Sequence, residues 1–297
     1  MQAPRLAFLI VSVWALTSNA PCFAFGDKGH KIVALIANHY LEPAVRIKVQ
    51  TILSADTTRL TPDTEIASEA TWSDKFRDSD RTTTKIHYDQ THNWHFVDLE
   101  LSNPDIDAAC FNHPAILHGK VASNAEPEDC VVDKIIQFAA ELKNPSTSAI
   151  ERRLSLQFLL HFIGDVHQPL HASNDNDKGG NDKIVKATGF NANNLHHYWD
   201  TYFVDSIGSD PSTIAQLIIA SITPGQLAAW KKGDAIAWAK QSYDVSKLWV
   251  YGDLGTADAT GKFVLTRSYV RHAKNATTKQ LARAGVRLAK VLNESLR

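Results

Sequence analysis

The sequence predicts an all-α fold in a single compact domain, because apolar residues recur with the helical period along most of the chain. Pro, Asn and Gly collect in the connections between these apolar segments, as is typical of turns. The segments with helical spacing are 32–41, 45–53, 131–142, 150–166, 214–220, 227–249 and 265–292. No internal repeat, low-complexity tract or linker divides the chain, so residues 25–297 are expected to form one domain.

Strand character is confined to two short stretches, 94–99 and 183–187. We therefore expect at most a small β-hairpin beside the helices. In a strand, alternation would place His95 and Val97 on one face of the first stretch, with Phe96 and Asp98 on the other.

The N-terminus has the pattern of a secretory signal peptide. Arg5 precedes an apolar stretch over 6–16, and the small residue Ala24 marks the expected cleavage site. A membrane anchor is the alternative, but this stretch is shorter than the roughly 20 residues that a spanning helix needs. The sequence thus predicts removal of residues 1–24 and an exported protein, periplasmic or secreted, without a membrane anchor.

The cysteines support an oxidising environment. Removal of the signal peptide also removes Cys22, which leaves Cys110 and Cys130 as a pair. We expect them to form a disulfide bond.

The charge composition excludes a strongly basic surface. The formal net charge is -1, so any binding of nucleic acid would have to rely on a local patch or on bound cations. The chain also contains 13 histidines, and their positions are more informative than their number.

Two pairs of histidine and aspartate have the spacing of metal ligands on a helix. His161 and Asp165 are four residues apart, as are His196 and Asp200, so each pair points to one side of its helix. Pro169 then ends the first helix, which allows His171 to return toward the same cleft. Either pair alone could be a surface hydrogen bond or a satisfied core pair. Apolar neighbours surround both, and a bound divalent cation is a common compensation for such buried groups.

Three further positions are candidates only in combination with these pairs. Asp74 is followed three residues later by Arg77, His95 lies in the stretch 94–99, and His30 follows shortly after Phe25. Taken separately, the segments of Asp74 and His95 each read as an ordinary amphipathic one. The remaining histidines, His92 among them, are interpreted as surface or structural residues.

In order along the chain, these segments resemble the trinuclear-zinc single-strand nuclease and 3'-nucleotidase family, of the mung bean nuclease type. The resemblance extends from residue 25 to about residue 202 and is weak beyond. Its motifs are G-x-x-G-H at 26–30, W-S-D-x-x-R at 72–77, H-F-V-D at 95–98, H-F-I-G-D-x-x-Q-P-L-H at 161–171, G-G-N at 179–181 and N-L-H-x-x-W-D at 194–200.

The resemblance implies three Zn²⁺ ions per chain, held by side chains from all of these motifs. One ion would take Asp74, His95, His161 and Asp165. A second would take His30, Asp165 and the free amine and carbonyl oxygen of the first mature residue, Phe25, where the family usually has Trp. The third would take His171, His196 and Asp200. Zinc accepts this mixture of imidazole nitrogen and carboxylate oxygen.

The resemblance also implies the activity, which is cleavage of single-stranded DNA and RNA to 5'-phosphate products together with 3'-nucleotidase activity. Asp74 and Asp165 would act in catalysis through the metal ions, whereas Arg77 and Asn181 would bind the phosphate. Phe96 would stack on a base whose edge hydrogen-bonds to Asp98; without the resemblance, Phe96 reads as a core aromatic. Single-stranded nucleic acid and nucleotides are the expected partners, and no obligate protein partner is evident.

Two alternatives remain open at this point. A zinc phospholipase C resembles the family in its fold and three-zinc plan but acts on lipid head groups; Arg77, the G-G-N segment and H-F-V-D favour the nuclease. The other alternative is a zinc-storage or zinc-stabilised binding protein without turnover, and the shared Asp165 argues against it.

Overall fold

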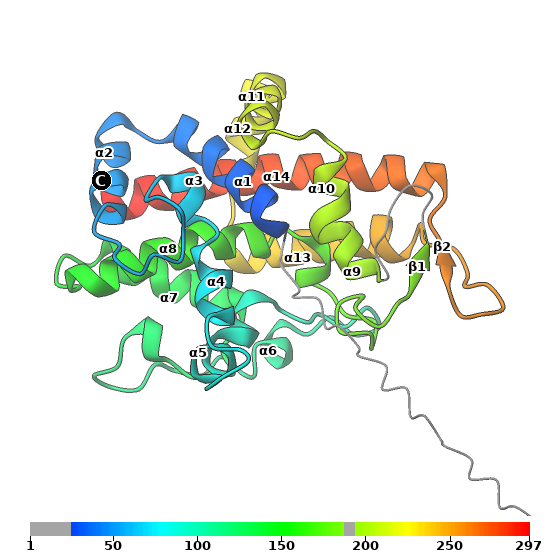
Figure 1. Cartoon of the computed structure of the whole chain (residues 1–297), viewed down its shortest axis with the longest axis horizontal. Helices are drawn as coiled ribbons and strands as arrows, with labels where there is room; N and C mark the ends of the chain where they lie inside the picture. The colour runs from blue at the N-terminus through cyan, green and yellow to red at the C-terminus, as the bar shows by residue number, and fades with distance from the viewer. Residues whose placement is uncertain (1–24, 187–193) are drawn as a thin grey trace, which may run out of the picture.

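The computed structural model describes residues 25–186 and 194–297, so the predicted signal peptide and its cleavage site lie outside this part of the chain. The described residues form a mainly helical domain, as predicted (Figure 1). Its longer helices are α1 (Gly26–Tyr40), α2 (Pro43–Leu53), α7 (Val131–Lys143), α8 (Ala149–Asp165), α11 (Pro211–Ser221), α13 (Ala235–Val245) and α14 (Arg267–Leu296). Shorter helical segments between them are α3 (Ile66–Glu69), α4 (Trp72–Asp78), α5 (Ile86–Thr91), η1 (His92–His95), α6 (Ile106–Ala109), η2 (Ala122–Asn124), η3 (Pro169–His171), α9 (Leu195–His197), η4 (Tyr198–Tyr202), α10 (Phe203–Asp205), α12 (Pro224–Trp230) and η5 (Ser246–Tyr251).

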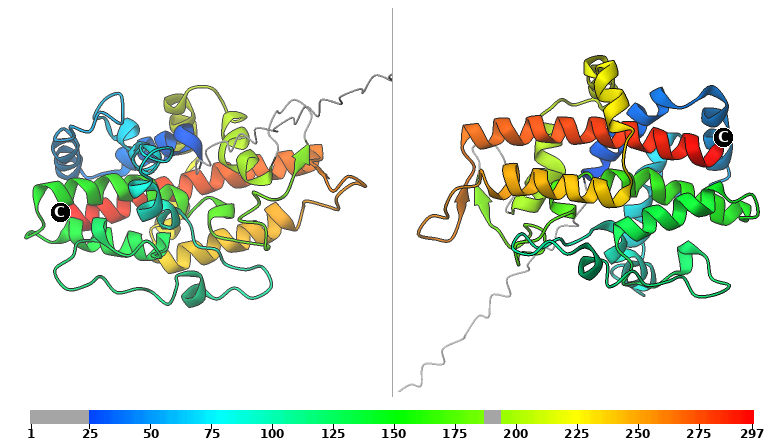
Figure 2. Two further views of the ribbon diagram at one scale, coloured as in Figure 1. Left: turned by 60° about the horizontal axis from the view of Figure 1, so that its bottom comes forward. Right: turned by 180° about the vertical axis from the view of Figure 1, so that it is seen from behind.

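The C-terminal helix α14 runs along the length of the molecule and supports the other helices (Figures 1 and 2). It packs against α1 over an extensive contact, at a point where Gly285 lies directly against Ile36. A side chain at Gly285 would meet Ile36 at 2.4 Å, so the two helices approach closely only because this residue is glycine. α7 and α8 form a second packed pair, and α8 also contacts α1 and α14. The C-terminal half of α8 is therefore buried on all sides, which is where the candidate metal ligands lie.

The single helix predicted over 227–249 is wrong. Gly233 adopts φ +81°, and the Asp234 side chain then caps a new helix by accepting a hydrogen bond from the backbone N–H of Ala237 at 2.9 Å. The chain therefore forms two helices, α12 and α13, and α13 continues as the π-helix η5.

The strand predicted over 94–99 is also wrong. Trp94 and His95 belong to the 3₁₀ helix η1, so both are buried, and the chain becomes extended only at Phe96. From Phe96 on, buried and exposed side chains alternate as in a strand, although these residues are not part of a β-sheet. Val97 is buried, while Phe96 and Asp98 are partly exposed. The Val97 N–H donates to the His171 carbonyl at 2.8 Å, which fixes this segment beside η3.

The strands of the described residues form one small sheet. β1 (Val185–Lys186) and β2 (Phe263–Val264) pair in parallel, with Val185 opposite Phe263. The prediction over 183–187 thus identified a real strand, although its last residue lies outside the described part. The two strands are not a hairpin, because they come from distant segments of the chain.

The predicted disulfide bond between Cys110 and Cys130 is confirmed. Cys110 follows α6, Cys130 precedes α7, and their Cα atoms are 4.9 Å apart. Both residues are fully buried, so the bond closes the loop between α6 and α7 from inside.

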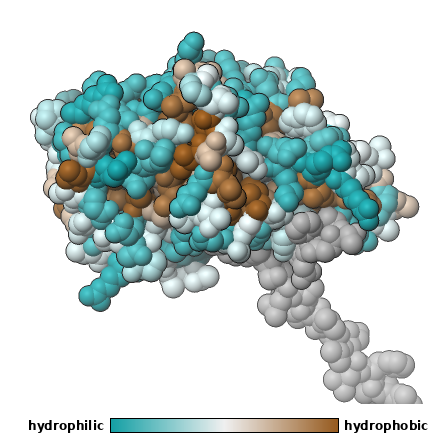
Figure 3. Space-filling model, turned by 90° about the horizontal axis from the view of Figure 1, so that it is seen from above, coloured by the Kyte–Doolittle hydropathy of each residue, from teal (hydrophilic) through white to brown (hydrophobic). Residues whose placement is uncertain are grey.

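On the face shown in Figure 3, hydrophilic residues surround hydrophobic ones that gather near its middle. Within residues 25–186 and 194–297, no helix combines the length and the apolar character that crossing a membrane would require.

Candidate metal centre

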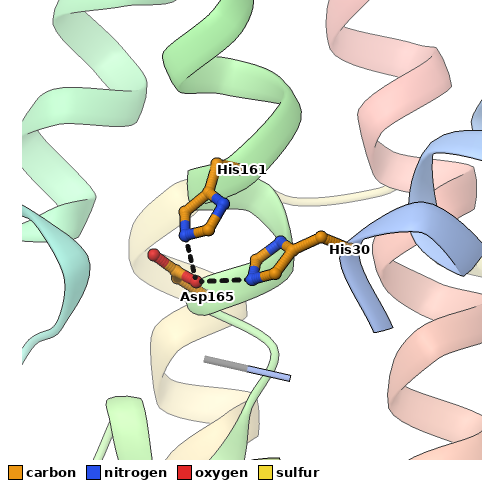
Figure 4. A group of neighbouring side chains, drawn as sticks. All are labelled: His30, His161 and Asp165. Atoms are coloured by element: carbon orange, nitrogen blue, oxygen red, sulfur yellow. Dashed lines mark ion pairs between the residues drawn. The ribbon is translucent and has the colours of Figure 1, made fainter. Parts of the chain in front are cut away.

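The C-terminal part of α8 carries the centre of the site. His161 and Asp165 lie one turn apart, and His30 of α1 reaches the same point from the opposite side (Figure 4). One oxygen of Asp165, Oδ1, is 3.4 Å from Nε2 of His161 and 3.3 Å from Nε2 of His30. The two imidazoles stack with their centroids 3.7 Å apart. Two imidazoles and one carboxylate, from two helices, thus form a group of three potential metal ligands.

Asp74 of α4 and His95 of η1 complete this first cluster. The Oδ1 atom of Asp74 lies 3.5 Å from Nε2 of His161 and 3.6 Å from Nδ1 of His95. The same Nδ1 of His95 is 2.9 Å from the other oxygen of Asp165, Oδ2. Asp165 therefore faces His30 with one oxygen and His95 with the other, as expected of a carboxylate shared between two ions.

The orientation of His161 fits a bound cation. Its Nδ1–H donates to the Ala70 carbonyl at 2.8 Å, so Nε2 directs a lone pair toward Asp165. Among the described residues, neither Nε2 of His161 nor Oδ1 of Asp165 has a hydrogen-bond partner, although both atoms are buried. Two facing acceptor atoms in a buried site are costly unless a cation lies between them.

A second cluster consists of His171, His196 and Asp200. The two Nε2 atoms are 3.2 Å apart, and that of His196 is 3.0 Å from Oδ2 of Asp200. The Nδ1–H of His196 donates to the Gly179 carbonyl at 2.6 Å, which again turns Nε2 toward the cluster. His196 lies in α9 and Asp200 in the π-helix η4, so their spacing of four residues spans a change of helix type.

The protonation of these groups favours metal ligation. Burial raises the pKa of Asp165 well above its usual range. Burial also lowers the pKa of His95 well below its usual range, assisted by the charge of Arg77, and lowers the pKa of His171 to about 4. Both imidazoles are therefore neutral near pH 7 and keep a lone pair for a metal ion. A cation would restore the charged form of Asp165, because an adjacent positive charge lowers a carboxyl pKa.

A cavity of about 400 Å³ borders both clusters, since His95 of the first and His171 and His196 of the second line it. It is lined by the ligand candidates His95, His171 and His196, by the predicted substrate residues Arg77, Phe96, Asp98 and Asn181, and by Arg81, Tyr88, His92, Leu170, Lys178 and Gly179. Residues predicted from separate motifs thus meet at one opening.

Arg77 is held rigidly at this opening. Its Nε and one terminal nitrogen each lie 3.0 Å from an oxygen of Asp78, and its other terminal nitrogen lies 2.7 Å from Asp74. Burial alone would raise the pKa of Asp74, but the charge of Arg77, with His161 next in effect, holds it well below its usual range. Burial raises the pKa of Asp98 to about 6.

Phe25 caps the N-terminus of α1, and its side chain is fully buried. Its carbonyl accepts a hydrogen bond from the Gly29 N–H at 3.0 Å. Metal binding by its backbone atoms requires the free amine that processing would create, and this stays a prediction.

The sequence reasoning missed residues that orient the ligands. Gln168 is fully buried, and its amide donates to Asp200. The buried Asp177 accepts from the Gly180 N–H and from the Tyr251 hydroxyl, both at 2.9 Å. These two bonds hold the loop that contains Gly179 and Gly180, called the glycine loop below, and the Gly179 carbonyl of this loop orients His196. The contacts of Gln168 with Asp200 and of Asp177 with Tyr251 join residues far apart in sequence, so no spacing rule reveals them.

His92, interpreted as a surface or structural residue, lies in the wall of the cavity. Tyr88 and Phe96 flank it in the sequence at intervals of four residues.

Comparison with known proteins gives a consistent result. The family model described as S1/P1 Nuclease matches residues 25–297. The chain is 29% identical to Nuclease P1 of Penicillium citrinum over 91% of this chain and 97% of that protein. It is 28% identical to Nuclease S1 of Aspergillus oryzae, over 83% and 79%, and 25% identical to Endonuclease 2 of Arabidopsis thaliana, over 97% and 96%. Since the match covers every residue of both clusters and of the cavity, the chain belongs to the S1/P1 nuclease family, and it is an enzyme that hydrolyses phosphodiester bonds.

Proposed function

We propose that this nuclease binds three Zn²⁺ ions and cleaves single-stranded DNA and RNA to 5'-phosphate products, with 3'-nucleotidase activity as well. The observation that carries the proposal is the convergence of two buried His/Asp clusters on one cavity that also contains Arg77 and Phe96. A structural metal site would be closed, whereas these clusters border an open space.

The donor atoms fit the metal. Asp74, His95, His161 and Asp165 would hold the first ion. His30, Asp165 and the processed N-terminus at Phe25 would hold the second, and His171, His196 and Asp200 the third. When bound, zinc would lower the pKa of a coordinated water toward neutrality and offset the negative charge that develops on the phosphate.

The chain itself would bind and orient the phosphate. Because Asp78 holds the guanidinium of Arg77 in a fork, Arg77 reaches the substrate in one fixed geometry and loses little entropy on binding. Asn181 lines the cavity on the glycine loop and would donate a hydrogen bond to a phosphate oxygen.

The base would bind between Phe96 and Asp98. Both side chains are partly exposed and line the same cavity, so a splayed base can stack on Phe96 while its edge hydrogen-bonds to Asp98. A base in a duplex is not free to do this, and the proposed preference for single strands follows.

We further propose that the enzyme is exported, periplasmic or secreted, after removal of residues 1–24. The buried disulfide bond supports this, because such bonds persist in oxidising compartments.

The decisive test combines metal analysis with substrate comparison on protein that begins at Phe25. We expect about three zinc ions per chain and release of acid-soluble nucleotides from single-stranded DNA or RNA, with much slower release from duplex. Phosphatidylcholine serves as the control substrate for the phospholipase alternative. Cleavage of the lipid alone, or a metal-free protein that cleaves nucleic acid, would contradict the proposal.

A further inference from the structure

Three aromatic side chains form a continuous wall of the cavity. Tyr88 of α5, His92 of η1 and Phe96 follow one another at steps of four residues. The rings of Tyr88 and His92 stack, with centroids 4.9 Å apart and an interplanar angle of 22°. The ring of Phe96 follows at 5.6 Å from His92, nearly perpendicular to it. All three residues line the cavity that borders the metal clusters.

Positively charged side chains lie beside these three aromatic rings. The guanidinium carbon of Arg81 lies 4.9 Å from the centroid of the Tyr88 ring, and its nearest acidic partner, Asp78, is 3.7 Å away. Arg77 lies at the metal end of the cavity, whereas Arg81 lies at the Tyr88 end. The exposed Lys178 also lines the cavity, from the glycine loop.

His92 behaves as a neutral ring in this setting. Its side chain is exposed at the cavity wall, and partial desolvation there, together with the charges of Arg77 and Arg81, lowers its pKa from the usual value. An uncharged imidazole stacks as an ordinary aromatic platform, so the positive charge along the wall comes from the guanidinium groups.

Alternating aromatic faces and cations are how proteins bind several nucleotides of a single strand in succession. The proposed base site at Phe96 accounts for one nucleotide. It leaves Tyr88, His92 and Arg81 without a role, although they continue the same wall.

We propose that His92 and Tyr88 form a second base-stacking subsite, which binds the nucleotide next to the one on Phe96, and that Arg81 binds a backbone phosphate there. This inference rests on the proposed nuclease function and deepens it, because it makes single-stranded oligonucleotides better substrates than nucleotides with one base. The subsite selects for chain length and not for sequence, since every base has a face that can stack.

The test measures kcat and KM of the zinc-loaded enzyme on a 3'-mononucleotide and on a short single-stranded oligonucleotide. We expect His92→Ala and Tyr88→Ala each to raise KM for the oligonucleotide by about tenfold, the scale of losing one base–aromatic stack. KM for the mononucleotide and both kcat values should stay within about twofold. His92→Phe retains a ring and should restore the wild-type KM.

Two further measurements separate stacking from a folding defect. An abasic site at the neighbouring position should raise KM for the wild type but not for His92→Ala, because the contact is already lost. Arg81→Gln should weaken oligonucleotide binding and reduce its dependence on salt, as removal of a phosphate contact does. Ile86→Ala is the matched control, since Ile86 lies on α5 but is 67% exposed and does not line the cavity.

The subsite would be overturned if His92→Ala and Tyr88→Ala changed KM equally on both substrates, or left KM for the oligonucleotide unchanged. Neither result would affect the proposed nuclease function, as long as the wild type turns over its substrates. Absence of turnover on either substrate by zinc-loaded wild type would instead overturn the proposed function, and the subsite with it.

Discussion

The backbone carbonyl of His95 accepts a hydrogen bond from Nδ1 of His171 at 2.8 Å, and this bond joins the two His/Asp clusters. The side chain of His95 belongs to the first cluster, whereas Nε2 of His171 belongs to the second. The Val97 N–H adds a return bond to the His171 carbonyl. The distance between the clusters is thus set by the backbone of the segment that also carries Phe96 and Asp98. The proposed metal sites and the proposed base pocket therefore share one support.

Asp165→Asn tests the shared carboxylate. An amide cannot supply two negatively charged oxygens, so both ions of the first cluster should bind weakly and turnover should fall below about a tenth of the wild-type rate. Zinc content should drop with kcat. Asp205→Asn is the control, because Asp205 is exposed and pairs only with Lys28 among the interactions found for it. A variant with normal turnover and full zinc content would show that Asp165 does not bridge two ions.

Removal of the metal should destabilise the fold as well as stop catalysis. Without a cation, buried acceptor atoms of the first cluster, such as Nε2 of His161 and Oδ1 of Asp165, face one another, and binding energy that contributes to folding is lost. We expect EDTA to lower Tm by about 5 °C or more, since 1 kcal/mol corresponds to roughly 2–4 °C in a domain somewhat smaller than this one. Differential scanning calorimetry with and without EDTA measures the shift. Added zinc should reverse it, and an unchanged Tm would contradict the metal sites.

The sequence predicted those parts of the site that depend on local spacing. His161 with Asp165 and His196 with Asp200 could be identified because four residues bring side chains to one side of a helix. The same rule worked across the junction of α9 and η4. How Asp74 or His30 reach these pairs depends on helix packing, and only the family resemblance placed them.

The misses have physical causes. Apolar spacing predicted one helix over 227–249, whereas the positive φ of Gly233 and the Asp234 cap end one helix and begin another. Residues 94–99 alternate in the manner of a strand, but no strand of residues 25–186 and 194–297 pairs with them, and tertiary contacts decide their backbone. Local pattern alone does not reveal whether such partners exist.

Lys134 provides a pH-dependent stability that is independent of the metal site. Its ammonium group is fully buried, lies 3.8 Å from the centroid of the Trp94 ring and hydrogen-bonds to the Ala122 carbonyl and Asp129. Burial lowers its pKa to about 8, with Asp129 opposing the effect. The unfolded chain, with a lysine pKa near 10.4, therefore binds more protons than the folded one between about pH 8 and pH 10. The free energy of unfolding therefore rises with pH across this window. Below about pH 8, Lys134 is charged in the folded chain too, and the full destabilisation from burying its ammonium group applies.

Lys134→Met should remove this dependence. Relative to the variant, the wild type should gain stability from pH 8 to pH 10, by an amount on the order of 2–3 kcal/mol. Comparing the two proteins cancels the titration of other groups. Urea unfolding at pH 7, 8.5 and 10 measures the difference, and a constant difference across the series would show that the pKa of Lys134 is not lowered.

Gln168→Met tests whether a buried amide positions the third metal ion. The Gln168 amide donates to Oδ1 of Asp200, and its carbonyl accepts from the Leu170 N–H at 2.6 Å. Methionine fills a similar volume but cannot donate, so Asp200 loses the bond that fixes its orientation. Loss of such a supporting bond typically weakens metal affinity by about 10- to 100-fold. We expect one of the three zinc ions to be removed at a correspondingly lower chelator concentration.

The matched control for this variant is Gln157→Met. Gln157 lies on α8, is also fully buried and donates to a carboxylate, that of Glu69 at 2.6 Å, but it does not contact Asp200. Both variants should lower the free energy of unfolding, since each leaves a buried carboxylate with one bond fewer. Only Gln168→Met should change the affinity of the third zinc ion, the one that Asp200 would hold. If both variants weaken that ion equally, the effect is a general loss of stability, and Gln168 has no positioning role.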